Sequence, residues 1–341
     1  MRLLLLMPTT TYRADAFVAA AEKMGVEIVF GSDRCHVLDE KGIVITTRDS
    51  LALDFLEPEI SRERIAEYAG RKPIDGVIAV DDATTVIAAL ASEKLGLPHN
   101  PVESARASRD KRRMRELFAG GGVRQARFRD LSVEMDPKEA AHEADRDPGF
   151  PCVIKPRMLS GSRGVMRADD EASFATAFAR LTRILDDPEV KARGGESAKT
   201  VLVESFVPGR EVALEGILRG GALEVLALFD KPDPLDGPFF EETYYVTPSR
   251  LPEATQERIV AEVVKAARAL GLVEGPLHAE LRVNDEGAFV LEIAARSIGG
   301  LCSRTLRFAS GMSLEEVLIR HAISRSGPPP SATGSGGGAC A

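Results

Sequence analysis

The sequence has no tryptophan and four cysteines, and no two cysteines show the Cys-x-x-Cys spacing of a zinc or redox site. Cysteines this sparse argue against a disulfide framework and predict reduced thiols in a cytoplasmic protein. No apolar run is long enough to span a bilayer, and the apolar segment 2–7 is too short for a signal peptide. We therefore expect no membrane partner.

The chain also lacks an excess of basic residues. Its net charge is −8, and acidic and basic residues are interspersed. A protein that binds nucleic acid needs a positive surface for the phosphate backbone, so we expect no nucleic acid partner. Small anionic ligands remain compatible with local positive charge.

Two common nucleotide-binding motifs are missing as well. Pro8 to Thr11 follow the first predicted strand, where an NAD-binding domain carries Gly-x-Gly-x-x-Gly. The glycines Gly161 and Gly164 come after Lys155, whereas a Walker A loop places its lysine after the glycines. A dehydrogenase with a Rossmann domain thus loses its main support, and a P-loop enzyme is excluded.

With 341 residues, of which 44% are hydrophobic, the chain can form two or three domains. Residues 1–105 alternate apolar strands with helix-period segments, which predicts a doubly wound, Rossmann-like parallel sheet. The predicted strands are 3–7, 26–30, 43–46 and 76–81, and the predicted helices are 14–24 and 84–95.

The remaining sequence predicts α+β structure in two further parts. Residues 106–200 contain a basic helix ending near 118, a glycine-rich joint, strand 150–155 and helix 174–185. Residues 201–325 contain strand 201–206, helix 257–270 and a last helix that begins with a capping box at Ser313 and Glu316. The Gly-, Pro- and Ser-rich tail 326–341 cannot bury a core, so we expect it to be disordered.

One predicted hairpin brings two carboxylates together. A three-residue turn at 285–287 pairs Asn284 with Ala288 and places Glu280 directly opposite Glu292. Side chains alternate along a strand, so both carboxylates share one face with Arg296. Like charges in this position destabilise a sheet unless a cation lies between them, and Mg²⁺ prefers such oxygen ligands together with phosphates. The hairpin therefore predicts a magnesium-bound nucleotide.

A second candidate site follows the strand 150–155. Lys155 ends this strand, and a Gly/Ser loop from Ser160 to Val165 comes next. Backbone N–H groups of such a loop can point at phosphate oxygens, and the lysine adds a positive charge. Taken alone, the same pattern also suits an ordinary hairpin turn beside a buried lysine stem.

Taken in order, these motifs resemble the ATP-grasp superfamily across roughly residues 70–305. The segments that carry the resemblance are Asp110-Lys111, 153–156, 160–165, 203–211, 278–283 and 291–296. Glu292 to Arg296 read Glu-Ile-Ala-Ala-Arg and precede Gly299-Gly300, which is most similar to carboxylate–amine ligases of the L-amino-acid ligase kind. The resemblance implies an ATP-grasp fold with an N-terminal pre-ATP-grasp domain, a small lid subdomain and a C-terminal antiparallel-sheet domain.

The resemblance also implies roles for individual residues. Phosphates of ATP are expected to contact Lys111, Lys155 and the loop residues Ser160, Gly161, Ser162 and Gly164. Adenine is expected against Glu204, Ser205, Phe206 and Val207, and the ribose against Glu211. One or two Mg²⁺ ions, or Mn²⁺ in their place, are expected on Glu280 and Glu292, with Lys155 and Arg296 as the catalytic cations.

The implied reaction joins a small-molecule carboxylate, such as an amino acid, to an amine through an acyl-phosphate, releasing ADP and phosphate. A biotin-carboxylase-like enzyme that activates bicarbonate and an ATP-binding module without catalysis are the alternatives. A homodimer is the default expectation for assembly.

Several candidate residues also have plain structural interpretations. The arginines around Lys111 are typical of a solvated helix face. His278 is compatible with a structural hydrogen bond, Glu211 with a surface pair to Arg210, and Cys302 with a small buried apolar residue.

Overall fold

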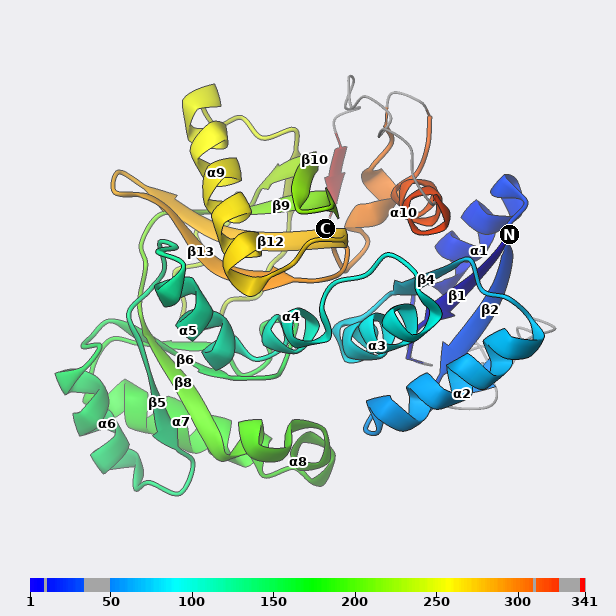
Figure 1. Cartoon of the computed structure of the whole chain (residues 1–341). Helices are drawn as coiled ribbons and strands as arrows, with labels where there is room; N and C mark the ends of the chain where they lie inside the picture. Colours follow the sequence, from blue (N-terminus) through cyan, green and yellow to red (C-terminus); the bar gives the residue numbers. More distant parts are fainter. Residues whose placement is uncertain (9–10, 34–49, 309–310, 325–337, 341) are drawn as a thin grey trace.

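The computed structural model describes residues 1–8, 11–33, 50–308, 311–324 and 338–340. They form three β-sheets with helices packed against them (Figure 1). The predicted strand at 43–46 lies outside the described residues.

The N-terminal sheet is parallel, with the strand order β3-β2-β1-β4. Leu3 to Leu6 of the central strand are fully buried, because a parallel strand between two helical layers needs apolar side chains on both faces. Helices α1 and α10 cover one face, and α2 and α3 cover the other. The sheet is therefore doubly wound, as predicted. Its elements are β1 (Arg2–Leu6), α1 (Ala14–Met24), β2 (Glu27–Ser32), β3 (Ser50–Ala52), α2 (Pro58–Arg71), β4 (Gly76–Ala79), η1 (Asp82–Thr84), α3 (Thr85–Leu95) and α10 (Leu314–Ile323).

A small antiparallel sheet has the order β5-β8-β6-β7, and α6 and α7 pack against it. Residues 157–165, which we call the flap, connect β6 to β7. Helices α4 (Val102–Ala107) and α5 (Lys111–Gly120) lead into this part from the N-terminal sheet. Its elements are β5 (Phe128–Ser132), α6 (Pro137–Arg146), β6 (Cys152–Pro156), β7 (Met166–Ala168), α7 (Glu171–Leu185), α8 (Pro188–Gly194), η2 (Gly195–Lys199) and β8 (Thr200–Ser205).

A large antiparallel sheet has the order β13-β12-β9-β10-β11-β14. Helices α9 and α5 share a hydrophobic core with it, and a second core joins it to α1 and α10 of the N-terminal part. Its elements are β9 (Arg210–Arg219), β10 (Ala222–Asp230), β11 (Tyr245–Thr247), α9 (Glu253–Leu270), β12 (Gly275–Asn284), β13 (Gly287–Ala294), η3 (Cys302–Thr305) and β14 (Gly338–Cys340). The capping box of Ser313 and Glu316 is present at α10, as predicted.

The β12–β13 hairpin confirms the predicted pairing of Glu280 with Glu292, but the predicted turn is wrong. Asn284 pairs with Gly287, so the turn has two residues instead of three. A β-bulge between the pairs Glu280–Glu292 and Leu281–Val290 leaves Leu291 as the extra residue. The bulge compensates for the shorter turn and restores the register at the carboxylates.

Two other expectations are wrong. Gly338–Cys340, in the tail expected to be disordered, form β14 and pair with β11. An edge strand offers backbone hydrogen bonds, so a segment can join it without an apolar core of its own. Cys302 forms a disulfide instead of a free thiol, whereas Cys152 is free and buried. Cysteines far apart in the chain give no sequence signal of their approach.

Within the described ranges, every helix is too short or too polar to cross a membrane.

Candidate functional site

A cleft with about 1010 Å³ of empty space is lined by residues of the small sheet, the flap and the large sheet. Polar side chains from segments far apart in the sequence converge on it. It brings together nearly all predicted site residues: Lys111, Lys155, Ser160, Gly161, Ser162, Glu204, Ser205, Phe206, Val207, Glu211, Glu280, Glu292 and Arg296.

Gly164 is the exception, because it does not line this cleft. Its φ of +79° suits glycine, and a Cβ at this position would lie 2.9 Å from Leu181 Cδ1 of α7. Gly164 therefore packs the flap against a helix, whereas Gly161, with φ of +64°, has open space around its Cα. A direct contact of Gly164 with a nucleotide stays a prediction.

Two lysines reach the cleft from different elements. Lys155, near the end of β6, contacts Glu204 Oε2 at 2.7 Å through Nζ. Lys111, the first residue of α5, donates from Nζ to the Leu159 carbonyl at 2.8 Å and lies 3.2 Å from Glu292 Oε1. Both side chains are largely buried, so their charges act in a medium that screens poorly.

Glu204 belongs to a buried triad with Arg115 and Lys155. Arg115 donates to its two oxygens at 2.7 and 3.3 Å. Burial alone would raise the pKa of Glu204, but Arg115 and Lys155 lower it to about 2. For Lys155 burial prevails, and its pKa is lowered despite Glu204. The interpretation of the neighbouring arginines as a solvated face is wrong for Arg115, which is 1% exposed.

The hinge after β8 has some of its polar groups already paired. Phe206 N–H donates to the Pro151 carbonyl at 3.0 Å, and the Val207 carbonyl accepts from Arg282 at 3.1 Å. With the Glu204 carboxylate held by two cations, an adenine ring at this hinge has fewer free partners than we expected.

A cluster of carboxylates surrounds Lys231, which is buried and is not the exposed strand-end charge that its position in the sequence also allowed. Its Nζ lies 2.9 Å from Glu211 Oε1 and 3.3 Å from Glu280 Oε1, and it also donates to Glu242. Burial opposes the charge of Lys231, yet Glu280 and Glu211 raise its pKa well above the ordinary value. Glu211 is therefore buried against Lys231 and Arg282, and it is no surface partner of Arg210.

The same cluster is chemically suited to a divalent cation. One oxygen each of Glu211, Glu242 and Glu280 lies within 4.8 Å of the others, and Glu280 is paired directly opposite Glu292 in the sheet. An oxygen-only donor set fits Mg²⁺, although the Lys231 ammonium group contacts all three of these carboxylates. Glu242 was missed because it lies in an irregular loop where no periodicity marks an inward side chain.

His278 connects this cluster to the interior. Its Nδ1 lies 3.2 Å from Glu215 Oε2, and its Nε2 lies 3.5 Å from Glu280 Oε1. Glu215 is fully buried and also accepts from the Ile298 N–H at 2.9 Å. The structural hydrogen bond considered for His278 is thus present, on a ring that also lines the cleft.

Arg296 closes the cleft toward the N-terminal sheet. Its Nη2 lies 2.9 Å from Asp82 Oδ2, in η1 just beyond the end of β4. Burial would raise the pKa of Asp82, but Arg296 holds it below the ordinary value. Sequence reasoning missed Asp82, although the adjacent acids Asp81 and Asp82 at the carboxyl end of a parallel strand were an available signal.

Comparisons with known proteins agree with this architecture. The family of the ATP-grasp domain matches residues 148–305, and that of the ATP-grasp N-terminal domain matches residues 18–99. The chain is similar to alanine–anticapsin ligase of Bacillus subtilis, with 27% identity over 271 residues, which cover 75% of this chain and 56% of that protein. It therefore spans little more than half the length of this relative.

A D-alanine–D-alanine ligase of Desulforudis audaxviator is 28% identical over 243 residues, covering 68% of this chain and 73% of that one. Among solved structures, an L-amino acid ligase from Bacillus licheniformis has a TM-score of 0.74 and 24% identity over 94% of this chain and 74% of that one. A biotin carboxylase of Campylobacter jejuni has a TM-score of 0.67 and 17% identity over 96% of this chain and 72% of that one. These two structural likenesses show the fold.

Proposed function

The chain belongs to the ATP-grasp superfamily, and from this premise we propose that it is an ATP-dependent carboxylate–amine ligase. The observation that carries the proposal is one cleft that is lined by Lys111, Lys155 and Arg296 together with the paired carboxylates Glu280 and Glu292. Its ligase relatives of known substrate also support the proposal.

On this proposal each of the three predicted parts of the chain supplies different residues of the site. Residues 106–200 supply the two lysines and the flap, and residues 201–325 supply the hinge and the carboxylates. Residues 1–105 supply Asp82, which fixes Arg296 at the end of the cleft where substrates enter.

The nucleotide occupies the cleft with its phosphates between Lys111, Lys155 and the flap. Adenine lies against the remaining backbone groups of Ser205–Val207, and the ribose lies near Glu211. Glu204 orients Lys155 instead of binding the base, because both of its oxygens are held by cations.

Glu280 and Glu292 would hold magnesium, and Glu211 and Glu242 lie close enough to Glu280 to assist. When bound, the ion neutralises phosphate oxygens and aligns the triphosphate. A substrate carboxylate oxygen attacks the γ-phosphorus, the bond to the bridging oxygen of ADP breaks, and an acyl-phosphate forms. The amine nitrogen then attacks the carbonyl carbon, phosphate leaves, and the nitrogen loses a proton. Lysines and Arg296 stabilise the charge on the transferred group.

The test is a panel of amino acids and other acids, supplied in pairs with ATP and Mg²⁺, with released phosphate and the joined product measured together. We expect product and phosphate in equal amounts for at least one pair. Glu292→Gln removes one carboxylate charge, so it should reduce turnover by at least about 100-fold while the nucleotide-free melting temperature stays close to that of the wild type. A surface variant, Glu286→Gln at the exposed hairpin turn, is the control.

Three outcomes contradict the proposal or its metal assignment. ADP release that needs bicarbonate and no amine identifies a biotin-carboxylase-like reaction. Nucleotide binding without phosphate release for any pair identifies a binding module. Full turnover by Glu292→Gln overturns the metal assignment.

A further inference from the structure

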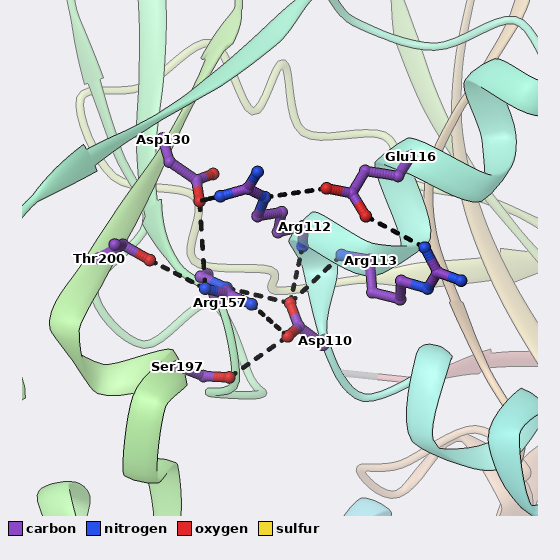
Figure 2. Close-up of polar contacts among 8 residues, drawn as sticks. All are labelled: Asp110, Arg112, Arg113, Glu116, Asp130, Arg157, Ser197 and Thr200. Carbon is purple, nitrogen blue, oxygen red and sulfur yellow. Dashed lines mark hydrogen bonds and ion pairs between the residues drawn. The ribbon is translucent and has the colours of Figure 1, made fainter.

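A network of charged side chains lies at the base of the flap, outside the cleft lining (Figure 2). At its centre, Arg157 donates from Nε to Asp110 Oδ1 at 3.1 Å and from Nη2 to Asp110 Oδ2. This is the two-pronged geometry in which an arginine binds a carboxylate most specifically. The side chains are 15% and 24% exposed, so the pair is only partly screened by water.

Asp110 is also the N-cap of α5. Its Oδ1 accepts from the N–H groups of Arg112 and Arg113 at 3.0 and 3.3 Å. Burial would raise the pKa of Asp110, but the hydrogen bonds and the charge of Arg157 keep it below the ordinary value. One carboxylate thus ties the start of a helix to the start of the flap.

Arg157 is anchored on its other side as well. Its Nη1 donates to Thr200 Oγ1 at 3.0 Å, and Figure 2 shows the guanidinium between Asp110, Asp130 and Thr200. Asp130 lies 4.0 Å away and is itself paired with Arg112. The first flap residue is therefore held to β5 and β8 of the small sheet.

The consequence concerns Lys111, which follows Asp110 directly. Its backbone N–H donates to the Arg157 carbonyl at 3.0 Å, and its Nζ donates to the Leu159 carbonyl at 2.8 Å. The position of this ammonium group thus depends on the path of residues 157–159. Arg157, where that path begins, is tied to Asp110 by the two-pronged pair.

We infer that Asp110 and Arg157 form a latch, a pair of positioning residues that fixes Lys111 and the flap for nucleotide binding without touching the nucleotide. The inference rests on the proposed function for the identity of the ligand. The tie between Asp110 and the flap does not depend on that identity.

The cap and the latch can be separated by choice of substitution. Asparagine caps helices about as well as aspartate, so Asp110→Asn keeps the cap and loses the charge pair. Asp110→Ala loses both. Arg157→Gln removes the latch from the other side, and Arg157→Lys keeps the charge but not the fork. Arg113→Gln, whose side chain pairs with Glu116 at the surface, is the matched control.

The first measurement is the dissociation constant of MgADP by calorimetry, together with the nucleotide-free melting temperature. We expect Asp110→Asn and Arg157→Gln each to weaken MgADP by about tenfold, because second-layer contacts of this kind typically change affinity by that order. The double variant Asp110→Asn with Arg157→Gln should bind MgADP no more weakly than either single variant. Arg157→Lys should bind MgADP more tightly than Arg157→Gln but less tightly than the wild type. Arg113→Gln should match the wild type.

The second measurement is the rate of tryptic cleavage after Arg163, an exposed flap residue, followed by mass spectrometry with and without MgADP. Both latch variants should be cut several times faster than the wild type in each condition. The latch is overturned if Asp110→Asn and Arg157→Gln both bind MgADP with wild-type affinity and are both cleaved at the wild-type rate. The role of Asp110 would then be only to cap α5. If the wild type itself does not bind MgADP, the proposed function fails, and cleavage of the nucleotide-free proteins still decides the latch.

Discussion

Two buried cations, Arg115 and Lys155, share the carboxylate of Glu204 beneath the cleft. A buried charge is costly without a partner, and removing one member of such a group leaves the others uncompensated. Glu204 therefore has a structural reason to stay ionised that is independent of any ligand. Its contact with Lys155 also fixes where that ammonium group points.

We predict that Glu204→Gln lowers the free energy of unfolding at neutral pH by roughly 3 kcal/mol, because it leaves two buried cations without their anionic partner. In the wild type the pKa of Glu204 is lowered to about 2, so its contribution is fully present above the unfolded value near 4.5. That contribution is lost as the pH falls from about 4.5 toward about 2, while Arg115 and Lys155 remain charged. Denaturant unfolding at several pH values measures it.

The variant should lack this part of the acid-induced loss, so the stability gap to the wild type narrows below pH 4.5. The control is Glu286→Gln at the exposed turn, which should follow the wild type throughout. A gap that stays constant down to pH 2 would refute the role of the Glu204 charge.

The sequence predicted the cleft residues that lie in ordered motifs, such as Lys155 and Glu292, because their neighbours in the chain mark them. It could not predict Arg115, since five arginines between 106 and 115 look alike until one faces inward. Asp82 and Glu242 approach the cleft from distant segments. Their contribution depends on how the sheets pack against one another. A local sequence pattern carries no information about that packing.

At the scale of elements, apolar periodicity was sufficient to predict the positions of several helices and strands. Helix α1 occupies 14–24 as predicted, and α7 begins only three residues before its predicted start. The β12–β13 hairpin shows the limit of such reasoning. Its register was right, yet it is set by a two-residue turn and a bulge at Leu291. Turn length and bulges offset one another, so a pattern of alternation alone cannot distinguish the two solutions.

The flap allows a prediction at this scale, because its glycines Gly161 and Gly164 have different surroundings. Both have positive φ, so alanine at either position costs about 1 kcal/mol in backbone conformation. Gly164→Ala adds a contact of 2.9 Å with Leu181, whereas Gly161→Ala meets open space. We expect Gly164→Ala to lower the melting temperature more than Gly161→Ala.

Differential scanning calorimetry without nucleotide makes this comparison directly, and Gly161→Ala serves as the control for the φ penalty. The penalty of Gly164→Ala should be smaller in a Leu181→Ala background than in the wild type, because that background lacks the atom that the new Cβ meets. Equal melting temperatures for the two glycine variants would show that the flap does not pack on α7 as tightly as the distances indicate.

At the scale of the whole molecule, the N-terminal part reaches the segment that follows β13 at three points. Asp82 contacts Arg296, Arg13 donates to Ser297 Oγ at 2.9 Å, and the Tyr12 hydroxyl accepts from the Gly300 N–H. Of the residues in these contacts, Arg296 lines the cleft. On the proposed function, the N-terminal sheet would set the geometry of the substrate end of the cleft through Asp82 and Arg296, and the other two sheets would set that of the nucleotide end.

This arrangement predicts that Asp82→Asn affects turnover at the substrate end of the cleft and leaves nucleotide binding at the other end nearly unchanged. The amide keeps the shape but loses the charge that orients Arg296, so turnover of a productive substrate pair should fall by roughly 10- to 100-fold. MgADP affinity should stay within about twofold, because Asp82 contributes nothing to the lining of the nucleotide cleft. Steady-state kinetics and calorimetry on the same preparation separate the two effects.

Glu63→Gln is the matched control for that experiment, since it removes an acidic group of the same part that pairs only at the exposed surface with Arg62 and Lys94. It should leave both turnover and nucleotide affinity unchanged. Asp82→Asn in an Arg296→Lys background should add little further loss if Asp82 acts by orienting the Arg296 guanidinium. A fall in MgADP affinity that matches the fall in turnover would instead mean that Asp82 acts on the whole cleft.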